Sequence, residues 1–346
     1  MTNLTQASHE LFSRPEDERF ETLADLASYC HNQRERSRRL KEPSAMFSPE
    51  VCDGRLSLRI NGYAPLTLNQ WSFSQMCSIA GVAKDTVNRL RPQTAAQVLT
   101  ETLHKRSDDD LDLQALVLDD SLLRSVNGER YRRLWNIDLV QTLQEFSVDF
   151  VPPQKGFNGA TGLYAGQQDM FCFLIDPNGW TDIGGEMFAP GFFVWNSEVG
   201  RRTVGISTFW YQRICGNHIV WDAVEVTEIT RRHIGRVRDT LAQIRQAIEQ
   251  LAKKRDERKD RFAKVVAKAM QTAYGQDREQ TQRLLSQAKF TRPLVQKATE
   301  IAAQSGGFSI WSMVNALTQL SRQTQFAGSR SELDQKASAL LNLVAV

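Results

Sequence analysis

The sequence predicts an α+β protein: a mostly antiparallel β-sheet domain with inserted helices, followed by an all-helical C-terminal domain with a long heptad-patterned helix. Two observations predict this class. Asn-Gly and Gly-Asn dipeptides punctuate β-rich runs between residues 55 and 223, and heptad-spaced apolar residues begin after Ala223. We therefore divide the chain into an N-terminal helical basic arm (1–45), an α+β domain (46–223) and a basic helical domain (224–346).

The first regular segment expected is a helix over residues 13–42. Ser13 can cap it, Pro15 suits its first turn, and Phe20, Leu23, Ala27 and Cys30 share one face. The segment ends in a basic run before Pro43, which consists of Arg34, Arg36, Arg38, Arg39 and Lys41. Cations near a helix C-terminus are favoured by the helix dipole, so we interpret the run as a solvated helix end, with a phosphate-touching arm as the alternative.

Four turn dipeptides predict the sheet region: Asn61-Gly62, Asn127-Gly128, Asn178-Gly179 and Gly216-Asn217. Tight hairpin turns can need positive φ at both central residues, and Asn and Gly tolerate that conformation. Pro65 has no backbone N–H and therefore predicts an edge strand after it. Helices expected at about 72–106 and 136–147 interrupt the sheet.

After Ala223 an apolar seam predicts a long helix. The seam residues are spaced 3, 4, 3, 4 and 3 apart and are Ile234, Val237, Leu241, Ile244, Ile248 and Leu251. The register continues through Arg255 and Arg258 to Phe262 and Val265, and the seam faces either a second chain or the chain's own later helices. We expect a homo-oligomer formed through the 234–251 seam, and further helices at 277–290, 293–303, 309–320 and 331–343.

The formal charge of +3 conceals an asymmetry. Residues 1–223 carry a net charge of −6 and residues 224–346 a net charge of +9, which keeps a polyanionic partner open. The N-terminus has no secretory signal, and no apolar run is long enough to span a membrane. The five cysteines lack a Cys-x-x-Cys pair, which favours reduced thiols. A cytoplasmic protein without a membrane partner is expected.

No catalytic, cofactor or metal signature is present, so the expectation is a protein without cofactor, metal or catalytic residues. Phosphate-cradling glycine motifs and His-rich metal motifs are both missing from the sequence. Cys215 and His218 straddle a predicted turn and are interpreted as a strand pair instead of a nucleophilic dyad. A metal-dependent nuclease remains the third alternative, with carboxylates drawn from Asp119, Asp120, Glu129 and Glu198.

Residues 75–90 follow the spacing of a helix-turn-helix, with Cys77 as the small residue and Gly81 in the turn. The second helix would present polar residues to a major groove, namely Lys84, Asp85, Asn88 and Arg89. Short helix pairs with a Gly turn are common, so ordinary domain helices are the favoured interpretation.

Aromatic residues interleaved with arginines at 192–221 predict a face that binds single strands. Trp195, Phe209 and Tyr211 would stack on bases, at about 1–3 kcal/mol per base. Guanidinium groups would neutralise phosphates, and the candidates are Arg130, Arg132, Arg133, Arg201, Arg202, Arg213 and Arg236. The alternative is ordinary sheet core, because aromatic residues favour strands.

Three blocks carry a resemblance to a known family: residues 127–136, 195–200 and 213–218. Together they resemble the uncharacterised phage/plasmid-like family labelled domain of unknown function 932, over about Pro49 to Arg238. The family-motif positions are Tyr131, Asn136, Asn196, Ser197, Glu198, Gly200, Cys215, Gly216 and Asn217. His218 stands where such proteins usually have glycine. The resemblance implies a mobile-element context and no settled activity.

The function expected from these observations is non-enzymatic binding of nucleic acid, with single-stranded DNA as the candidate partner. The protein would serve replication or recombination of a phage, prophage or plasmid. The runner-up is an interaction module that binds a host or phage protein through the helical domain.

Overall fold

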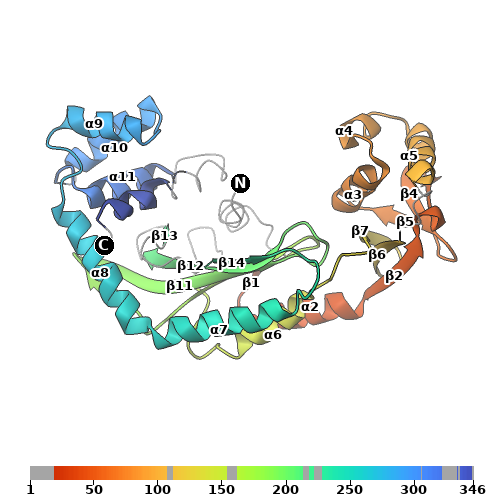
Figure 1. Ribbon diagram of the computed structural model, residues 1–346, viewed down its shortest axis with the longest axis horizontal. Coiled ribbons are helices and arrows are strands. Elements are labelled where there is room, and N and C mark those ends of the chain that lie inside the picture. Colours follow the sequence, from red (N-terminus) through yellow and green to blue (C-terminus); the bar gives the residue numbers. More distant parts are fainter. Residues whose placement is uncertain are drawn as a thin grey trace.

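The computed structural model describes residues 19–106, 112–153, 162–212, 218–221, 228–304, 306–321, 333 and 336–344. It contains two β-sheets and a helical C-terminal region, which confirms the α+β class. In Figure 1 an elongated base carries one of the sheets, and two groups of helices rise from the same side of it at opposite ends.

Sheet B has six strands in the order β2-β6-β7-β5-β4-β3. Its strands are β2 (Ser37–Pro43), β3 (Phe47–Cys52), β4 (Arg55–Ile60), β5 (Leu66–Leu68), β6 (Asp112–Leu118) and β7 (Leu122–Gly128). All neighbours are antiparallel except β5 and β7. Its helices are α3 (Gln70–Ala80), α4 (Lys84–Val87) and α5 (Pro92–Arg106), of which α3 begins with an Asn69 capping box.

Two hairpins of sheet B turn on aspartates with positive φ. Asp53-Gly54 joins β3 to β4 with φ of 50° and 72°, and Asp119-Asp120 follows β6 with φ of 51° and 52°. Asp tolerates the left-handed region because its short side chain bonds locally.

Sheet A has eight strands, six of them in the order β1-β8-β9-β11-β12-β13. β10 also pairs with β11, and β14 with β12. The strands are β1 (Arg19–Phe20), β8 (Leu163–Ala165), β9 (Met170–Ile175), β10 (Thr181–Ile183), β11 (Glu186–Asn196), β12 (Val204–Gln212), β13 (His218–Trp221) and β14 (Glu228–Arg231). All the pairings within this sheet are antiparallel.

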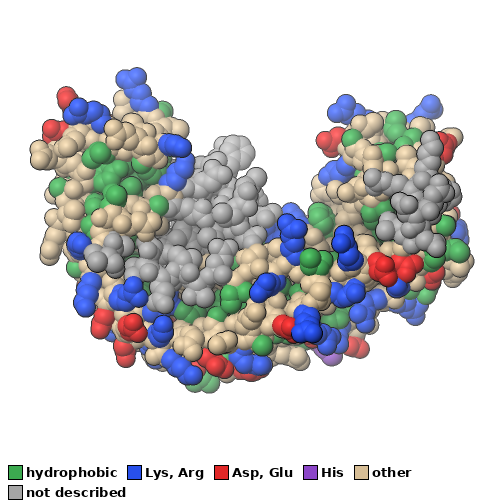
Figure 2. Space-filling view, viewed as in Figure 1, with side chains coloured by type: hydrophobic (Ala, Val, Ile, Leu, Met, Phe, Trp, Pro, Cys, Tyr) green, Lys and Arg blue, Asp and Glu red, His purple; other side chains and the backbone are tan. Residues whose placement is uncertain are grey.

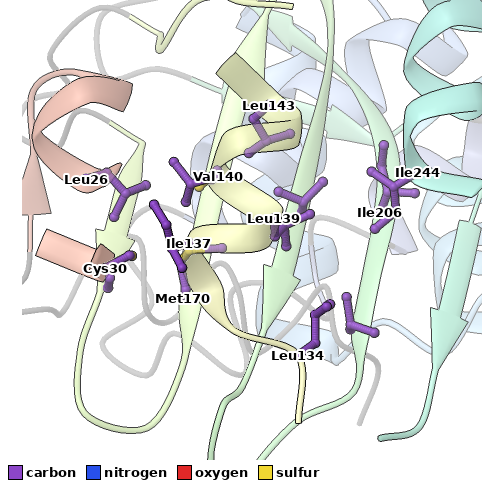
Figure 3. Close-up of a cluster of buried hydrophobic side chains, with 14 of the residues drawn as sticks. Leu26, Cys30, Leu134, Ile137, Leu139, Val140, Leu143, Met170, Ile206 and Ile244 are labelled. Atoms are coloured by element: carbon purple, nitrogen blue, oxygen red, sulfur yellow. The ribbon is translucent and has the colours of Figure 1, made fainter. Parts of the chain in front are cut away.

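Sheet A is buried on both faces. Helices α2 (Leu23–Glu35), α6 (Asn136–Gln144) and α7 (Asp239–Lys253) share one apolar core with alternate residues of β9, β11 and β12. Figure 3 shows this core, with Ile244 of α7 beside Ile206 of β12. On β9, β11 and β12, the residues that alternate with these core residues point to the other face of the sheet. There they form an aromatic cluster, which includes Phe173, Phe193 and Phe209.

The C-terminal helices form a separate core. They are α8 (Arg255–Gln271), α9 (Arg278–Gln287), α10 (Arg292–Gln304), α11 (Ile310–Ser321) and the 3-10 turn η4 (Leu340–Leu343). Phe262 of α8 stacks on Trp210 of β12, with ring centroids 4.1 Å apart, and so joins this core to sheet A.

The long helix predicted after residue 234 is divided at Lys254, where α7 ends and α8 begins. The bend has a packing reason, because Ile244 and Ile248 enter the sheet A core while Phe262 and Val265 enter the C-terminal core. The seam of α7 is therefore intramolecular. The chain itself covers Val237, Ile244, Ile248 and Leu251, whereas Ile234, at the start of the predicted seam, is 56% exposed. The oligomer expected through residues 234–251 therefore stays a prediction, without the support of an unpartnered seam on α7.

Several local predictions also need correction. Residues 37–43 form β2 and do not continue the preceding helix, which ends at Glu35. β5 was expected at an edge but is an interior strand between β7 and β4. Pro65 lies before the strand begins, so the N–H that proline lacks is not needed for the ladder. The Asn61-Gly62 reversal is confirmed by the pairing of β4 with β5.

The remaining turn dipeptides differ from one another. β7 runs through Asn127-Gly128 without reversing. The chain turns at Asn178-Gly179, but β9 pairs with β8 and β11 and not with β10. β12 and β13 pair antiparallel, as the predicted reversal at Gly216-Asn217 requires, although that dipeptide itself lies outside the described residues.

Candidate nucleic-acid interface

The segment that leads from β7 to α6 meets the segment that leads from β14 to α7. Tyr131 forms an isolated antiparallel bridge with Ile234. Beside it, the Arg132 N–H donates to the His233 carbonyl at 2.7 Å. This pairing brings Arg132 and Arg133 next to the basic residues 231–238, about one hundred positions later in sequence.

A cleft of about 570 Å³ opens at this meeting point. Three stretches line it: β2, the 129–133 segment and the 235–239 segment, together with Gln114 of β6. Six of the twelve lining residues are basic, and these are Arg39, Lys41, Arg132, Arg133, Arg236 and Arg238. Two are acidic, Glu129 and Asp239, so the cleft carries an excess of positive charge. In Figure 2, Lys and Arg side chains lie along the face that carries α7 and β2, with Asp and Glu side chains among them.

Three of these six cations are available to a ligand without losing an ion pair. Arg39, Arg236 and Arg238 are exposed, and within the described part of the chain none of them has an ion-pair partner. Lys41 differs, because its Nζ lies 2.7 Å from an Asp112 oxygen and 3.3 Å from a Glu129 oxygen. These two carboxylates raise the pKa of Lys41.

Arg133 is the most enclosed of the six cations. Its Nε donates to the Glu198 carbonyl at 2.9 Å, and its guanidinium lies 5.6 Å from the Tyr131 ring centroid and 5.5 Å from that of Trp135. Burial lowers the pKa of Arg133 to about 10, so the group stays protonated at neutral pH. Its Nη1 is buried and has no hydrogen-bond partner among the described residues.

A buried network positions this wall of the cleft. The Glu198 carboxylate accepts the Asn136 backbone N–H at 2.9 Å and pairs with Arg124 at 3.1 Å. The Asn196 amide donates to the Leu134 carbonyl at 3.0 Å and to Asn136 Oδ1 at 2.8 Å. The turn after β11 therefore fixes both the path of residues 133–136 and the start of α6.

The same turn also holds Tyr131. The Tyr131 hydroxyl donates to the Ser197 carbonyl at 3.1 Å, and burial raises the pKa of this phenol. Gly200 has φ of +80°, and a Cβ there would lie 2.9 Å from Asn127 Oδ1 and 3.1 Å from the Tyr131 ring. Six motif positions named from the sequence thus belong to one contact network: Tyr131, Asn136, Asn196, Ser197, Glu198 and Gly200.

The predicted base-stacking face does not exist as proposed. Trp195 and Phe209 are 0% exposed and Tyr211 is 5% exposed, because all three belong to the aromatic cluster of sheet A. Phe209 and Tyr211 point to one face of the sheet and Trp210 to the other, as expected. Both faces are covered, however, so all three rings are buried in hydrophobic clusters. No base can reach these rings in the folded protein.

The predicted arginines fall into several groups. Arg132, Arg133 and Arg236 meet in the cleft, whereas exposed Arg130 and Arg201 are not among its lining residues. Arg202 is buried, and its Nε lies 2.6 Å from Asp169 Oδ2, so it is a structural cation. Arg213 and the motif positions Cys215, Gly216 and Asn217 lie outside the described residues.

Two sites that the sequence left open as alternatives do not form. Helix α4 has only four residues, which is too short to serve as a recognition helix, although Gly81 does adopt the left-handed turn conformation. Asp119 and Asp120 pair with Arg36 and Arg38 at one end of the β6–β7 hairpin, while Glu129 follows its other end. Glu198 is 1% exposed, so the four carboxylates proposed for a nuclease do not converge. Among the described residues, no three His, Cys, Asp or Glu side chains come together as metal ligands.

The cleft includes three cations that the predicted face omitted: Arg39, Lys41 and Arg238. The basic run at 34–41 was the signal for the first two, and its alternative interpretation as a phosphate-touching element names the same residues. Since Arg39 and Lys41 are two positions apart on strand β2, they share one face of it.

Comparison with known proteins leaves the site to be interpreted from its chemistry. No protein-family model, no curated protein and no solved structure matches the chain. Within the described ranges, no helix combines the length and the hydropathy that crossing a bilayer requires.

Proposed function

We propose that the protein binds nucleic acid without catalysing a reaction, and that the phosphate backbone lies in the basic cleft. The observation that carries the proposal is the convergence of six Arg and Lys residues from three distant stretches of sequence on one cleft. The resemblance to a phage/plasmid-like family adds the expected setting, the replication or recombination of a mobile element.

The chemistry of the cleft suits phosphate. Arginine presents a planar fork of donors that matches phosphate oxygens, and five of the six cleft cations are arginines. Arg39, Arg236 and Arg238 can release condensed counterions when they contact a strand, because no described carboxylate neutralises them first.

Fluorescence anisotropy with labelled oligonucleotides tests this proposal. The double variant Arg236→Gln/Arg238→Gln should bind about ten-fold or more weakly at low salt, whatever the base sequence. Arg55→Gln is the control for the loss of an arginine elsewhere on the surface, although it removes one charge and not two, since Arg55 is an exposed arginine on β4, outside the residues that line the cleft. Equal affinity of the double variant and the wild type would overturn the proposal.

A further inference from the structure

The basic cleft continues into two neighbouring depressions. A smaller one of about 260 Å³ shares Arg236, Val237 and Asp239 with the cleft. A third, again about 570 Å³, shares Arg231 and Gln243 with the second. The three depressions therefore form one path, which runs from β2 to the C-terminal end of α7.

The far part of this path lies between β14 and α7. Helix α7 forms one wall with Gln243, Gln246 and Gln250. Strand β14 forms the opposite wall with Ile229 and Thr230. An adjacent face of α7 packs into the core, where Ile244 and Ile248 are buried. Helix α7 has 15 residues and is therefore about 22 Å long.

The lining of this part suits an extended polyanion. It contains two exposed cations, Arg231 and Lys254, together with the buried Arg258, and none of the described residues that line it is acidic. The glutamine amides each offer donors and an acceptor, so they can bond to sugar and base edges of any sequence. Six cations line the cleft, and the positive charge continues along the rest of the path with Arg231, Arg232, Lys254 and Arg258.

We infer that the nucleic acid is a single strand, which leaves the basic cleft and follows α7 as far as Lys254. This inference rests on the proposed function. The two larger depressions, at about 570 Å³ each, have the volume of small-ligand pockets, and the one between them is smaller, at about 260 Å³, so the path fits one strand better than the wider duplex. The length of α7, about 22 Å, gives the strand room for a few nucleotides in addition to those in the cleft.

Oligonucleotide length provides the first test. Affinity for the wild-type protein should rise steeply with length until about eight to ten nucleotides are present, and then level off. A duplex of the same length should bind about ten-fold more weakly than the single strand at equal salt. Equal affinity for duplex and single strand would overturn the inference and leave the cleft proposal intact.

A negative charge introduced on α7 provides the second test. Gln246→Glu places a carboxylate on the path, whereas Ala242→Glu places a carboxylate at an exposed position of the same helix outside the lining. We expect Gln246→Glu to weaken binding of a strand of about twelve nucleotides at least five-fold, with little effect on one of about four. Ala242→Glu changes the net charge by the same amount and should leave both affinities unchanged.

The outcomes separate the two proposals. If Arg236→Gln/Arg238→Gln weakens binding and Gln246→Glu does not, the cleft binds nucleic acid but the path along α7 is wrong. If no oligonucleotide binds, the proposed function fails as well. If polyglutamate binds as tightly as the oligonucleotide and Gln246→Glu weakens it equally, the path is an acidic-peptide groove and the inference of a nucleic-acid strand is overturned.

Discussion

Arg124 of β7 and Glu198, in the turn after β11, form an ion pair across the junction of the two sheets. Arg124 Nη2 lies 3.1 Å from Glu198 Oε2, and each side chain is only 1% exposed. Because Glu198 also accepts the Asn136 N–H, the pair connects sheet B, sheet A and the start of α6. The wall of the basic cleft depends on this connection, since the backbone carbonyl of Glu198 holds Arg133.

Glu198→Gln should destabilise the fold. The amide can still accept the Asn136 N–H, but Arg124 then keeps a buried charge without a counter-charge. Loss of one partner of a buried pair costs about 3–5 kcal/mol in the free energy of unfolding, which urea denaturation measures. Glu129→Gln is the control, because Glu129 pairs with Lys41 at the surface and its loss should cost under about 1 kcal/mol. Similar losses in both variants would contradict a structural role for Glu198.

Gly200→Ala tests the close approach of this turn to Tyr131. The substitution must place a Cβ 2.9 Å from Asn127 Oδ1 at a φ of +80°. Gly62→Ala is the matched control, since Gly62 has φ of +75° and nothing lies within 4 Å of the point that its Cβ would occupy. We expect Gly62→Ala to cost about 1 kcal/mol from backbone conformation alone, and Gly200→Ala at least about 1 kcal/mol more. Equal changes in thermal midpoint would show that the contact is not tight.

Trp195→Phe separates core packing from base stacking. Trp195 is 0% exposed, stacks on Phe193 at 4.8 Å, and donates its indole N–H to Thr203 Oγ1 at 3.1 Å. The variant should lose about 1–3 kcal/mol of stability and keep its affinity for oligonucleotides. Anisotropy below the unfolding transition checks the affinity. A specific loss of binding by a variant that remains folded would restore the stacking hypothesis.

His233 should make the fold sensitive to mild acid. Burial lowers the pKa of His233 to about 4, against about 6.5 for an unfolded histidine. Between these values the unfolded chain binds a proton that the folded protein does not, so stability is complete above about pH 6.5 and falls as the pH drops toward 4, by up to about 3 kcal/mol. The urea midpoint of wild type and of His233→Gln, measured at several pH values, should differ in slope over this window. Parallel curves would contradict the assignment.

Sequence patterns predicted the elements whose causes are local. The Asn61-Gly62 reversal and the helices at 278–287, 292–304 and 310–321 depend on turn residues and apolar periodicity within each segment. The sequence predicts helix at β2 because its basic residues suit a helix C-terminus and the next break is Pro43, but strand pairing with β6 decides its conformation. Asp119-Asp120 turned a hairpin without the glycine that signals one.

The cleft could be predicted only in part, because tertiary pairing creates it. The bridge between Tyr131 and Ile234 joins residues about one hundred positions apart, and nothing in either segment predicts that contact. The burial of Trp195 and Phe209 has the same origin, since a strand pattern does not tell whether one face or both faces of its sheet are covered. The basic run at 34–41 did indicate two cleft residues, Arg39 and Lys41, because a cluster of charges is visible in the sequence without knowledge of tertiary contacts.

The salt dependence of single-strand binding tests the central claim most directly. The logarithm of the association constant should fall linearly with the logarithm of the salt concentration, with a slope of about −0.7 for each phosphate neutralised. Arg236→Gln/Arg238→Gln should make that slope shallower by about 1.4, while Arg55→Gln should leave it unchanged. A slope that the double variant does not alter, or an affinity independent of salt, would contradict binding of nucleic acid in the basic cleft.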